Sequence, residues 1–380
     1  MIYLDNAATS WPKPKEVHKY MEKCLKMCGG NPGRGTYKSA LDAEKIVYST
    51  RECLAKLFNI ENPLDIIFTM NATYGINFAI KGMVKPGDHV ITTSMEHNAV
   101  ARPLIQLKND IGLKITFINC STTGQIDLNE IRKAITPETR LIVSTHASNV
   151  TGTIMPIDEI GMIARQYNIP FLVDASQTAG VIPIDTKKSN IKLLAFPGHK
   201  GLMGPQGIGG LYVEHGINLN PIITGGTGSN SANLNQPMET PDRYESGTLN
   251  LPGIGGLYGA LKFILNKKVQ NIYNHEKKLT DILISKLQRI RGIKVYCGNV
   301  RNRVGVVSFN YKDVDSRLIG DLLTEHGIAV RTGLHCAPLA HNTIGTLKQG
   351  TVRFSMGYFN TKYDIDYAVH TLKHIISKHL

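Results

Sequence analysis

Between residues 65 and 213, short β-branched runs alternate with amphipathic segments, and this rhythm restricts the fold more than any other feature. Strands are expected near 65–70, 89–94, 114–119, 141–145, 171–175 and 208–213, and helices near 74–83, 97–108, 127–135 and 157–168. Such alternation is typical of βαβ units, so the sequence predicts an α/β fold with a mostly parallel sheet covered by helices. Ligand groups gather at the carboxyl ends of such strands, where Asp174 and Lys200 fall.

The chain changes character after this region. The stretch from Gly225 to Asn250 is rich in glycine and hydroxyl residues and is expected to form a long loop, a kind that is usually functional or disordered. Beyond it, helices near 271–290, 315–326 and 363–378 and strands near 293–297, 304–311, 328–332 and 350–356 predict a smaller α+β domain. With 380 residues, the chain is long enough for two domains.

The charge and the cysteine content limit the kinds of partner and ligand that the sequence is expected to bind. The formal net charge of +13 would attract nucleic acid, acidic proteins or small anions. The basic residues are scattered and aromatics make up only 7%, so a nucleic-acid platform is not expected. Six cysteines without regular spacing indicate reduced thiols, and Cys24 and Cys28 share a helical face with apolar neighbours, which favours core packing over a metal site.

Neither a membrane helix nor a secretory signal is expected. No uninterrupted apolar stretch approaches the roughly 18 residues that a membrane helix needs. The first residues, Met1 to Asn6, lack both a basic region and an apolar core. The sequence therefore predicts a cytoplasmic protein.

Asp174 and Lys200 together indicate pyridoxal phosphate chemistry. Asp174 ends a buried apolar run, where an ionised carboxylate is costly unless a cation such as a pyridinium nitrogen meets it. Lys200 lies in the glycine-rich segment 198–207 and is expected to hold the cofactor covalently through its amine and to act as a base. Gln177 would donate to the cofactor's phenolic oxygen. Without the other residue, Asp174 would be interpreted as a turn residue, and Lys200 would be interpreted as an exposed loop lysine.

Two further segments complete the expected cofactor site. The residues from Met70 to Asn77 follow a strand and open a helix, so their free amides, with Ala72 and the Thr73 hydroxyl, form a natural phosphate cradle. His97 follows the next strand and is expected to stack on the cofactor ring. The simpler readings are a helix cap and a hydrogen-bonded loop histidine.

Near the C-terminus, Cys336 and Arg353 suggest how a substrate would be handled. Cys336 lies in a loop with His335, Gly333 and Pro338, and positive charge from His335 and Arg331 would favour its thiolate. Arg353 lies in a strand pattern that would fix its guanidinium for a bidentate carboxylate. The alternatives are a buried structural cysteine and an internal ion pair.

These segments occur in an order that resembles the cysteine desulfurase and selenocysteine lyase group of the class V aminotransferases, which are fold type I pyridoxal phosphate enzymes. The matching segments span nearly the whole chain. They are Tyr3 to Thr9, Asn31 to Gly35, His97, Thr145 to Asn149, Asp174 to Gln177, His199 with Lys200, Gly225 to Gly228, Glu245 to Asn250, Arg331 to Pro338, and Arg353 to Thr361.

The resemblance implies a homodimer with a seven-stranded, mostly parallel sheet in a large domain, residues 14–258, and a small domain from residues 1–13 and 259–380. It implies that Lys200, Cys336 and His97 are catalytic. The cofactor-binding residues would be Ala72, Thr73, His97, Asp174, Gln177, His199, Lys200 and Thr248, the last reaching the partner subunit's phosphate. The substrate would meet Ala7, Asn149 and Arg353.

The implied reaction converts L-cysteine to L-alanine and leaves the sulfur on Cys336 as a persulfide for an acceptor protein or small thiol, as in iron–sulfur cluster assembly. Three positions depart from the family pattern: Pro197 replaces a hydroxyl residue, Leu334 replaces a frequent histidine, and Ala337 runs directly into Pro338. They leave selenocysteine lyase, another elimination and transamination open as alternatives. A non-catalytic scaffold would require the intact Lys200, Asp174 and Cys336 to be unused.

Overall fold

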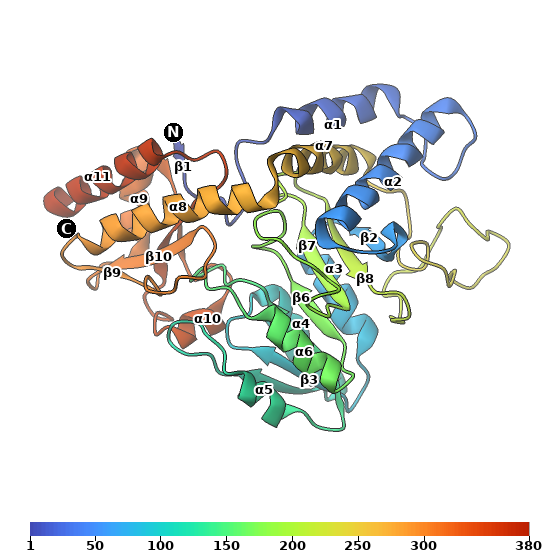
Figure 1. Ribbon diagram of the computed structural model, residues 1–380, viewed down its shortest axis with the longest axis horizontal. Coiled ribbons are helices and arrows are strands. Elements are labelled where there is room, and N and C mark those ends of the chain that lie inside the picture. The colour runs from blue at the N-terminus through green and yellow to red at the C-terminus, as the bar shows by residue number, and fades with distance from the viewer. Residues whose placement is uncertain (380) are drawn as a thin grey trace.

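The computed structural model describes residues 1–379 and contains a large sheet, a small sheet and a two-stranded pairing, with helices packed against the first two (Figure 1). The large sheet has seven strands in the order β2–β8–β7–β6–β5–β3–β4. Their bounds are β2 Ile66–Thr69, β3 His89–Thr93, β4 Lys114–Ile118, β5 Thr139–Thr145, β6 Phe171–Asp174, β7 Leu193–Pro197 and β8 Gly209–Val213. Neighbouring strands from β4 to β7 run parallel, whereas β8 is antiparallel to both β7 and β2. The predicted mostly parallel seven-stranded sheet is therefore confirmed.

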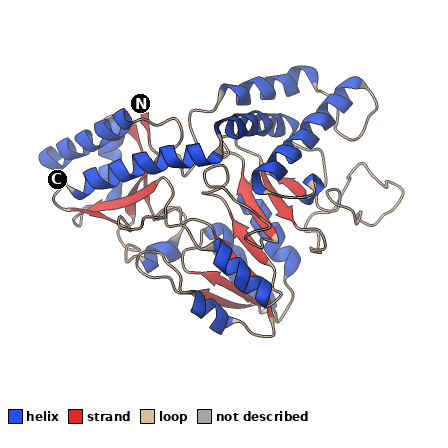
Figure 2. Ribbon diagram, in the orientation of Figure 1, coloured by secondary structure: helices blue, strands red, loops and turns tan. Residues whose placement is uncertain are grey.

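Helices cover the large sheet on both faces, as the secondary-structure colouring shows (Figure 2). They are α1 Lys15–Met27, α2 Lys38–Phe58, α3 Ala72–Met83, α4 Asn98–Ile111, α5 Leu128–Ala134, α6 Ile157–Gln166 and α7 Leu251–Lys267. Alternate residues of the strands point into two separate hydrophobic clusters, one on each face. This double burial explains why the strands read as continuous apolar runs.

The small sheet has the order β12–β13–β10–β9, with β9 Ile293–Val295, β10 Val306–Tyr311, β12 Arg331–Gly333 and β13 Thr351–Ser355. The long helix α8 Val269–Gln288 packs beside it with α9 Ser316–Glu325 and α11 Lys362–His379. The N-terminal strand β1 Ile2–Tyr3 pairs with β11 Ile328–Ala329, so the first residues join this part of the molecule. The short helix α10 Pro338–Thr343 follows the Cys336 loop.

The sequence reading missed β7 and the helices α2, α7 and α10. The strand β7 has no β-branched residue, although all five of its residues are buried. Glycines hid α7 because they lower helix propensity. A Cβ at Gly255 would lie 2.3 Å from the Cys24 sulfur, and one at Gly259 would lie 2.3 Å from the Glu16 carbonyl oxygen. These glycines let α1 approach α7 closely, and Cys24 and Cys28 are buried as predicted.

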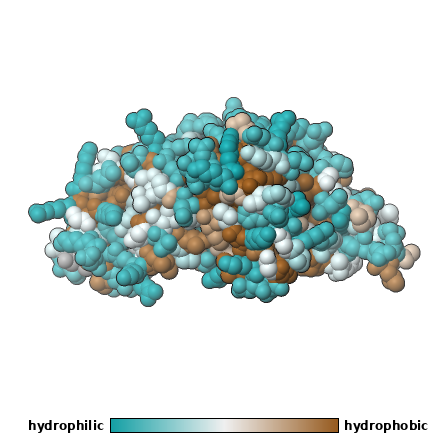
Figure 3. Space-filling model, turned by 90° about the horizontal axis from the view of Figure 1, so that it is seen from below, coloured by the Kyte–Doolittle hydropathy of each residue, from teal (hydrophilic) through white to brown (hydrophobic). Residues whose placement is uncertain are grey.

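None of the helices within residues 1–379 combines the length and the apolar character that spanning a membrane requires. Viewed from below, the surface shows hydrophobic residues between hydrophilic side chains that project around them (Figure 3).

The predicted long loop between β8 and α7 contains no helix or strand. Its C-terminal end is fixed by the buried ion pair of Arg51 Nη2 with Glu245 Oε2, at 2.5 Å.

Candidate active site

A cavity of about 70 Å³ opens at the carboxyl ends of the parallel strands, where ligand groups were expected. The elements that build its wall are the start of α3, the loop after β3, and the ends of β5, β6 and β7. The cavity is lined by Asn71, Ala72, Thr73, His97, Ala99, Thr145, Ala147, Asn149, Asp174, Ser176, Gln177, Pro197, His199 and Lys200. The structure thus brings together every predicted cofactor-binding residue except Thr248.

Lys200 follows β7 and is half-buried. Burial of its amine lowers the pKa of Lys200 to about 8, a shift that Asp174 opposes and to which the charges of Arg353 and Arg331 add. An amine with such a pKa is partly unprotonated near neutral pH, as a covalent anchor or a base requires. Asp174 is 2% exposed and accepts a hydrogen bond from the Ser176 amide at 2.9 Å.

The cavity residues fit pyridoxal phosphate. At the start of α3 the Asn71 side chain caps the Tyr74 amide, which leaves the amides of Ala72 and Thr73 in the first turn free of intrahelical partners and suited to a phosphate. Within residues 1–379, Asp174 has no ion-pair partner, so its buried carboxylate suits a protonated ring nitrogen.

His97 caps α4 and presents a neutral ring. Its Nδ1 accepts a hydrogen bond from the Ala99 amide at 3.0 Å, so the ring proton lies on Nε2. Burial, followed by the charge of Lys200, lowers the pKa of His97 to about 4. A neutral aromatic ring in the cavity wall suits stacking on a planar cofactor. The simpler reading, a hydrogen-bonded loop histidine, is compatible with this geometry because the bond uses only one ring nitrogen.

His199 and Gln177 also line the cavity. Burial and the charge of Lys200 lower the pKa of His199 to about 4, and His199 Nδ1 is buried without a hydrogen-bond partner among residues 1–379. Gln177 Nε2 donates to the Ala7 carbonyl at 3.2 Å. Its donor is therefore already engaged by the N-terminal segment, and its predicted bond to a phenolic oxygen would use its second hydrogen.

Arg353 and Asn149 lie together beside the cavity. Arg353 is fully buried in β13, and its Nη1 donates to the Asn149 carbonyl at 3.1 Å while its Nη2 pairs with Asp5 Oδ1 at 2.7 Å. Burial lowers the pKa of Arg353, and Asp5 opposes this shift. The internal ion pair considered as an alternative is present. Arg353 Nε, however, is buried with no partner within residues 1–379, so the guanidinium keeps a donor for a carboxylate.

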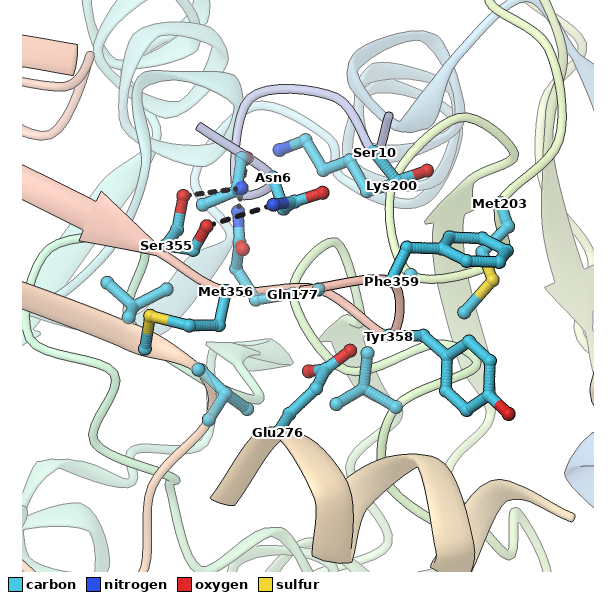
Figure 4. Close-up of a pocket in the computed structure, with 17 residues that line it drawn as sticks. Asn6, Ser10, Gln177, Lys200, Met203, Glu276, Ser355, Met356, Tyr358 and Phe359 are labelled. Carbon is cyan, nitrogen blue, oxygen red and sulfur yellow. Dashed lines mark hydrogen bonds between the residues drawn. The ribbon is translucent and has the colours of Figure 1, made fainter. Parts of the chain in front are cut away.

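Ala7 lines an adjoining cavity of about 40 Å³, which shares Lys200 and Gln177 with the first. The sequence reading missed an acid here: Glu276 of α8 is 5% exposed and points into this cavity beside Tyr358 (Figure 4). Burial raises the pKa of Glu276 to about 8. In the sequence, Glu276 looks like any polar residue of an amphipathic helix, so no local signal could have marked it.

A second buried acid was also missed. Glu96 accepts from Thr93 Oγ1 at 2.6 Å and from the Thr145 amide at 3.0 Å, and burial raises its pKa to about 8. It ties the end of β5 to the loop that carries His97. The pairing of Glu96 and His97 in one short loop was the available signal.

Cys336 is exposed, whereas the other cysteines are buried or half-buried. Arg331 Nη2 donates to its sulfur at 3.3 Å. The expectation that His335 carries a positive charge is wrong. The ring is buried, with Nε2 2.9 Å from Thr351 Oγ1. Burial lowers the pKa of His335 well below the ordinary value, so the ring is neutral. Arg331 therefore supplies the positive charge near the thiol, and the same charge lowers the pKa of Lys200.

Thr248 lies on the long loop, is exposed, and does not line the cavity of its own chain. Its action on the phosphate of a partner subunit stays a prediction from the resemblance. Among residues 1–379, no group of three or more His, Cys, Asp or Glu side chains is arranged to hold a metal ion.

Known proteins are similar to this chain over nearly its whole length. A family model described as Aminotransferase class-V covers residues 2–368. The chain is 34% identical to a probable cysteine desulfurase of Methanothermobacter thermautotrophicus, covering 98% of this chain and 94% of that protein. It is 32% identical to cysteine desulfurase IscS of Dictyoglomus turgidum, covering 99% of this chain and 95% of that protein.

Solved structures agree with these relatives. The apo structure of a cysteine desulfurase from Thermococcus onnurineus matches with a TM-score of 0.94 at 31% identity, covering 99% of this chain and 94% of that one. The cysteine desulfurase CsdA of Escherichia coli matches with a TM-score of 0.87 at 26% identity, covering 99% and 94%. The resemblance predicted from the motifs is confirmed.

Proposed function

Because the chain belongs to the class-V aminotransferase family, we propose that it is a pyridoxal phosphate-dependent cysteine desulfurase that moves sulfur from L-cysteine to Cys336. The observation that carries this proposal is that Arg331 connects the cavity around Lys200 with the Cys336 thiol. Arg331 contacts the Cys336 sulfur, and its charge also acts on Lys200 and His97 in the cavity wall. A lysine site and an exposed thiol thus share one electrostatic environment.

The bound cofactor supplies an electron sink for the carbon atoms of the substrate. Lys200 would hold it covalently, and the Lys200 amine, with a pKa of about 8, could take up the α proton of the substrate near neutral pH. The buried Asp174 carboxylate would hold the ring nitrogen in its protonated form. The neutral ring of His97 would pack against the planar group. Asn149 and Arg353 Nε bind the substrate carboxylate.

The sulfur step balances without an external oxidant. The Cys336 thiolate attacks the sulfur of the substrate, a sulfur–sulfur bond forms, and the carbon–sulfur bond breaks with its electron pair moving to carbon. Protonation of that carbon and return of the α proton to its own carbon give L-alanine, so L-cysteine and the Cys336 thiol yield L-alanine and a Cys336 persulfide. Arg331 stabilises the attacking thiolate. The persulfide then passes to an acceptor protein or small thiol, for which the exposed position of Cys336 is suited.

The proposal includes a homodimer in which Thr248 reaches the cofactor phosphate of the partner subunit. Its support is that Thr248 is exposed and absent from its own cavity, although the loop end beside it is fixed by the buried pair of Glu245 and Arg51. Mixing Lys200→Ala and Thr248→Ala subunits tests this arrangement. If sites are shared, one site of the mixed dimer combines both changes and the other has neither, so activity returns. The cytoplasmic location and the division into two domains stay predictions from the sequence.

One experiment tests the function directly. The purified protein is titrated with pyridoxal phosphate, its absorbance is recorded before and after L-cysteine is added, and alanine and sulfide are measured in the same sample. Wild type is expected to form the coloured adduct and release alanine, whereas Lys200→Ala does neither. Equal turnover by Cys336→Ala would remove the thiol from the mechanism. If wild type turns over L-selenocysteine but not L-cysteine, and Cys336→Ala does the same, the protein is a selenocysteine lyase.

A further inference from the structure

The loop that carries Cys336 has a strained backbone. His335 has a φ of 50° and Cys336 a φ of 57°, so two consecutive residues with side chains adopt the left-handed conformation that favours glycine. Such residues persist only where the surrounding structure holds them. The contacts that hold this loop therefore decide where the thiol lies.

Two donors from the cofactor side of the molecule hold the loop. The Asn98 amide donates to the Cys336 carbonyl at 2.9 Å, and Asn149 Nδ2 donates to the His335 carbonyl at 2.7 Å. Asn98 is the first residue of α4 and directly follows His97, whereas Asn149 lines the cofactor cavity. Both strained residues are thus bonded to segments that build the cavity.

The Asn149 donor is itself rigid. Its carbonyl accepts from Arg353 Nη1 at 3.1 Å, and the next two carbonyls, of Val150 and Thr151, accept from Ser308 Oγ at 2.6 Å and Arg303 Nη2 at 2.8 Å. All three donors are fully buried side chains. The main chain of residues 149–151 is therefore tied to β13, to β10 and to Arg303, so the Asn149 side chain extends from a fixed backbone.

We propose that Asn149 is a positioning residue for Cys336 as well as a substrate ligand, and that it acts together with the Asn98 amide. The amide nitrogen of an asparagine side chain carries two hydrogens. One binds the His335 carbonyl, and the second faces the substrate carboxylate, a role that rests on the proposed function. A single side chain then sets the distance between the substrate and the attacking sulfur.

Hydrogen exchange in cofactor-free protein tests this role without any turnover. Asn149→Asp keeps the size of the side chain but removes the donor to His335. Asn98→Pro removes the main-chain donor together with the Asn98 side chain, at a first helical position that tolerates proline, and Asn98→Ala is the matched control that removes only the side chain. Exchange of the peptide that spans residues 333–338 is expected to rise about fivefold in Asn149→Asp and Asn98→Pro, the effect of one lost hydrogen bond, and to stay unchanged in Asn98→Ala.

Wild-type exchange in a folded Asn149→Asp protein would overturn the proposal, as would equal exchange in Asn98→Pro and Asn98→Ala. If Asn149→Asp does not fold, Asn149→Ser, whose side chain is too short to reach the His335 carbonyl, takes its place. Steady-state kinetics adds a separate readout: Asn98→Pro lowers kcat at unchanged KM, whereas Asn149→Asp changes both. If the protein proves to have no desulfurase activity, the exchange result still decides the positioning role.

Discussion

Because of Glu276, the folded protein should become less stable as the pH rises. A variant with a side chain that cannot ionise at this position should not show this loss of stability. The side chain is 5% exposed, and burial is the only cause that raises its pKa, from 4.5 to about 8. Between these two values, the unfolded chain has released the proton while the folded protein still holds it. Ionisation therefore favours the unfolded state progressively from pH 4.5, and the loss is complete above pH 8.

The magnitude follows from the pKa difference. Each pH unit between the two values costs about 1.4 kcal/mol, so the full cost approaches 5 kcal/mol, about a third or more of the stability of a typical domain. Glu276→Gln keeps the shape of the side chain and cannot ionise. The unfolding free energy of Glu276→Gln minus that of wild type is expected to increase by about 1.4 kcal/mol for each pH unit above 4.5. This difference stays constant above pH 8.

Urea unfolding of both proteins at a series of pH values, roughly 5 to 9, measures this difference. Glu325→Gln is the matched control, because it makes the same chemical change at an exposed position of α9. A stability difference between Glu276→Gln and wild type that does not vary with pH would refute the reasoning. The same conclusion would follow if the control showed the same pH dependence.

Three further changes probe the charges and the packing around the site. Arg331→Gln should slow alkylation of Cys336 by iodoacetamide, because the sulfur loses the charged donor that lies 3.3 Å away; an unchanged rate would contradict the role of Arg331. Glu245→Gln should lower the unfolding free energy by about 3 kcal/mol, measured in urea, because it leaves Arg51 buried without its partner. Gly259→Ala should cost about 1–3 kcal/mol by thermal or urea unfolding, since its Cβ would meet the Glu16 carbonyl at 2.3 Å; wild-type stability would show that α1 can shift.

Much of the cofactor cavity could be predicted because its residues carry local signals. Asp174, Lys200 and His97 each follow a recognisable strand or a glycine-rich segment, and parallel strands bring such positions to one edge of a sheet. The strand β7 escaped because tertiary burial, and not β-branched composition, makes it a strand. The position of Lys200 was still inferred from the residues around it.

What could not be predicted depends on contacts between distant parts of the chain. Nothing near Arg353 in the sequence indicates that Asp5 pairs with it. The neutral state of His335 follows from its burial against Thr351, which a loop sequence does not reveal. Glu276 faces a cavity because the packing of α8 beside the small sheet brings this side chain to Gly305 and Tyr358, and helical periodicity alone gives no such information.

The two halves of the site are completed at different times during synthesis. All residues that line the cavity around Lys200 fall between 71 and 200, and the last strand of their sheet ends at Val213. Arg353, by contrast, which contacts both Asp5 and Asn149 and is proposed to bind the substrate carboxylate, lies close to the end of the chain. A ribosome therefore makes every residue of this cavity wall well before it makes the side chain proposed to recognise the amino acid.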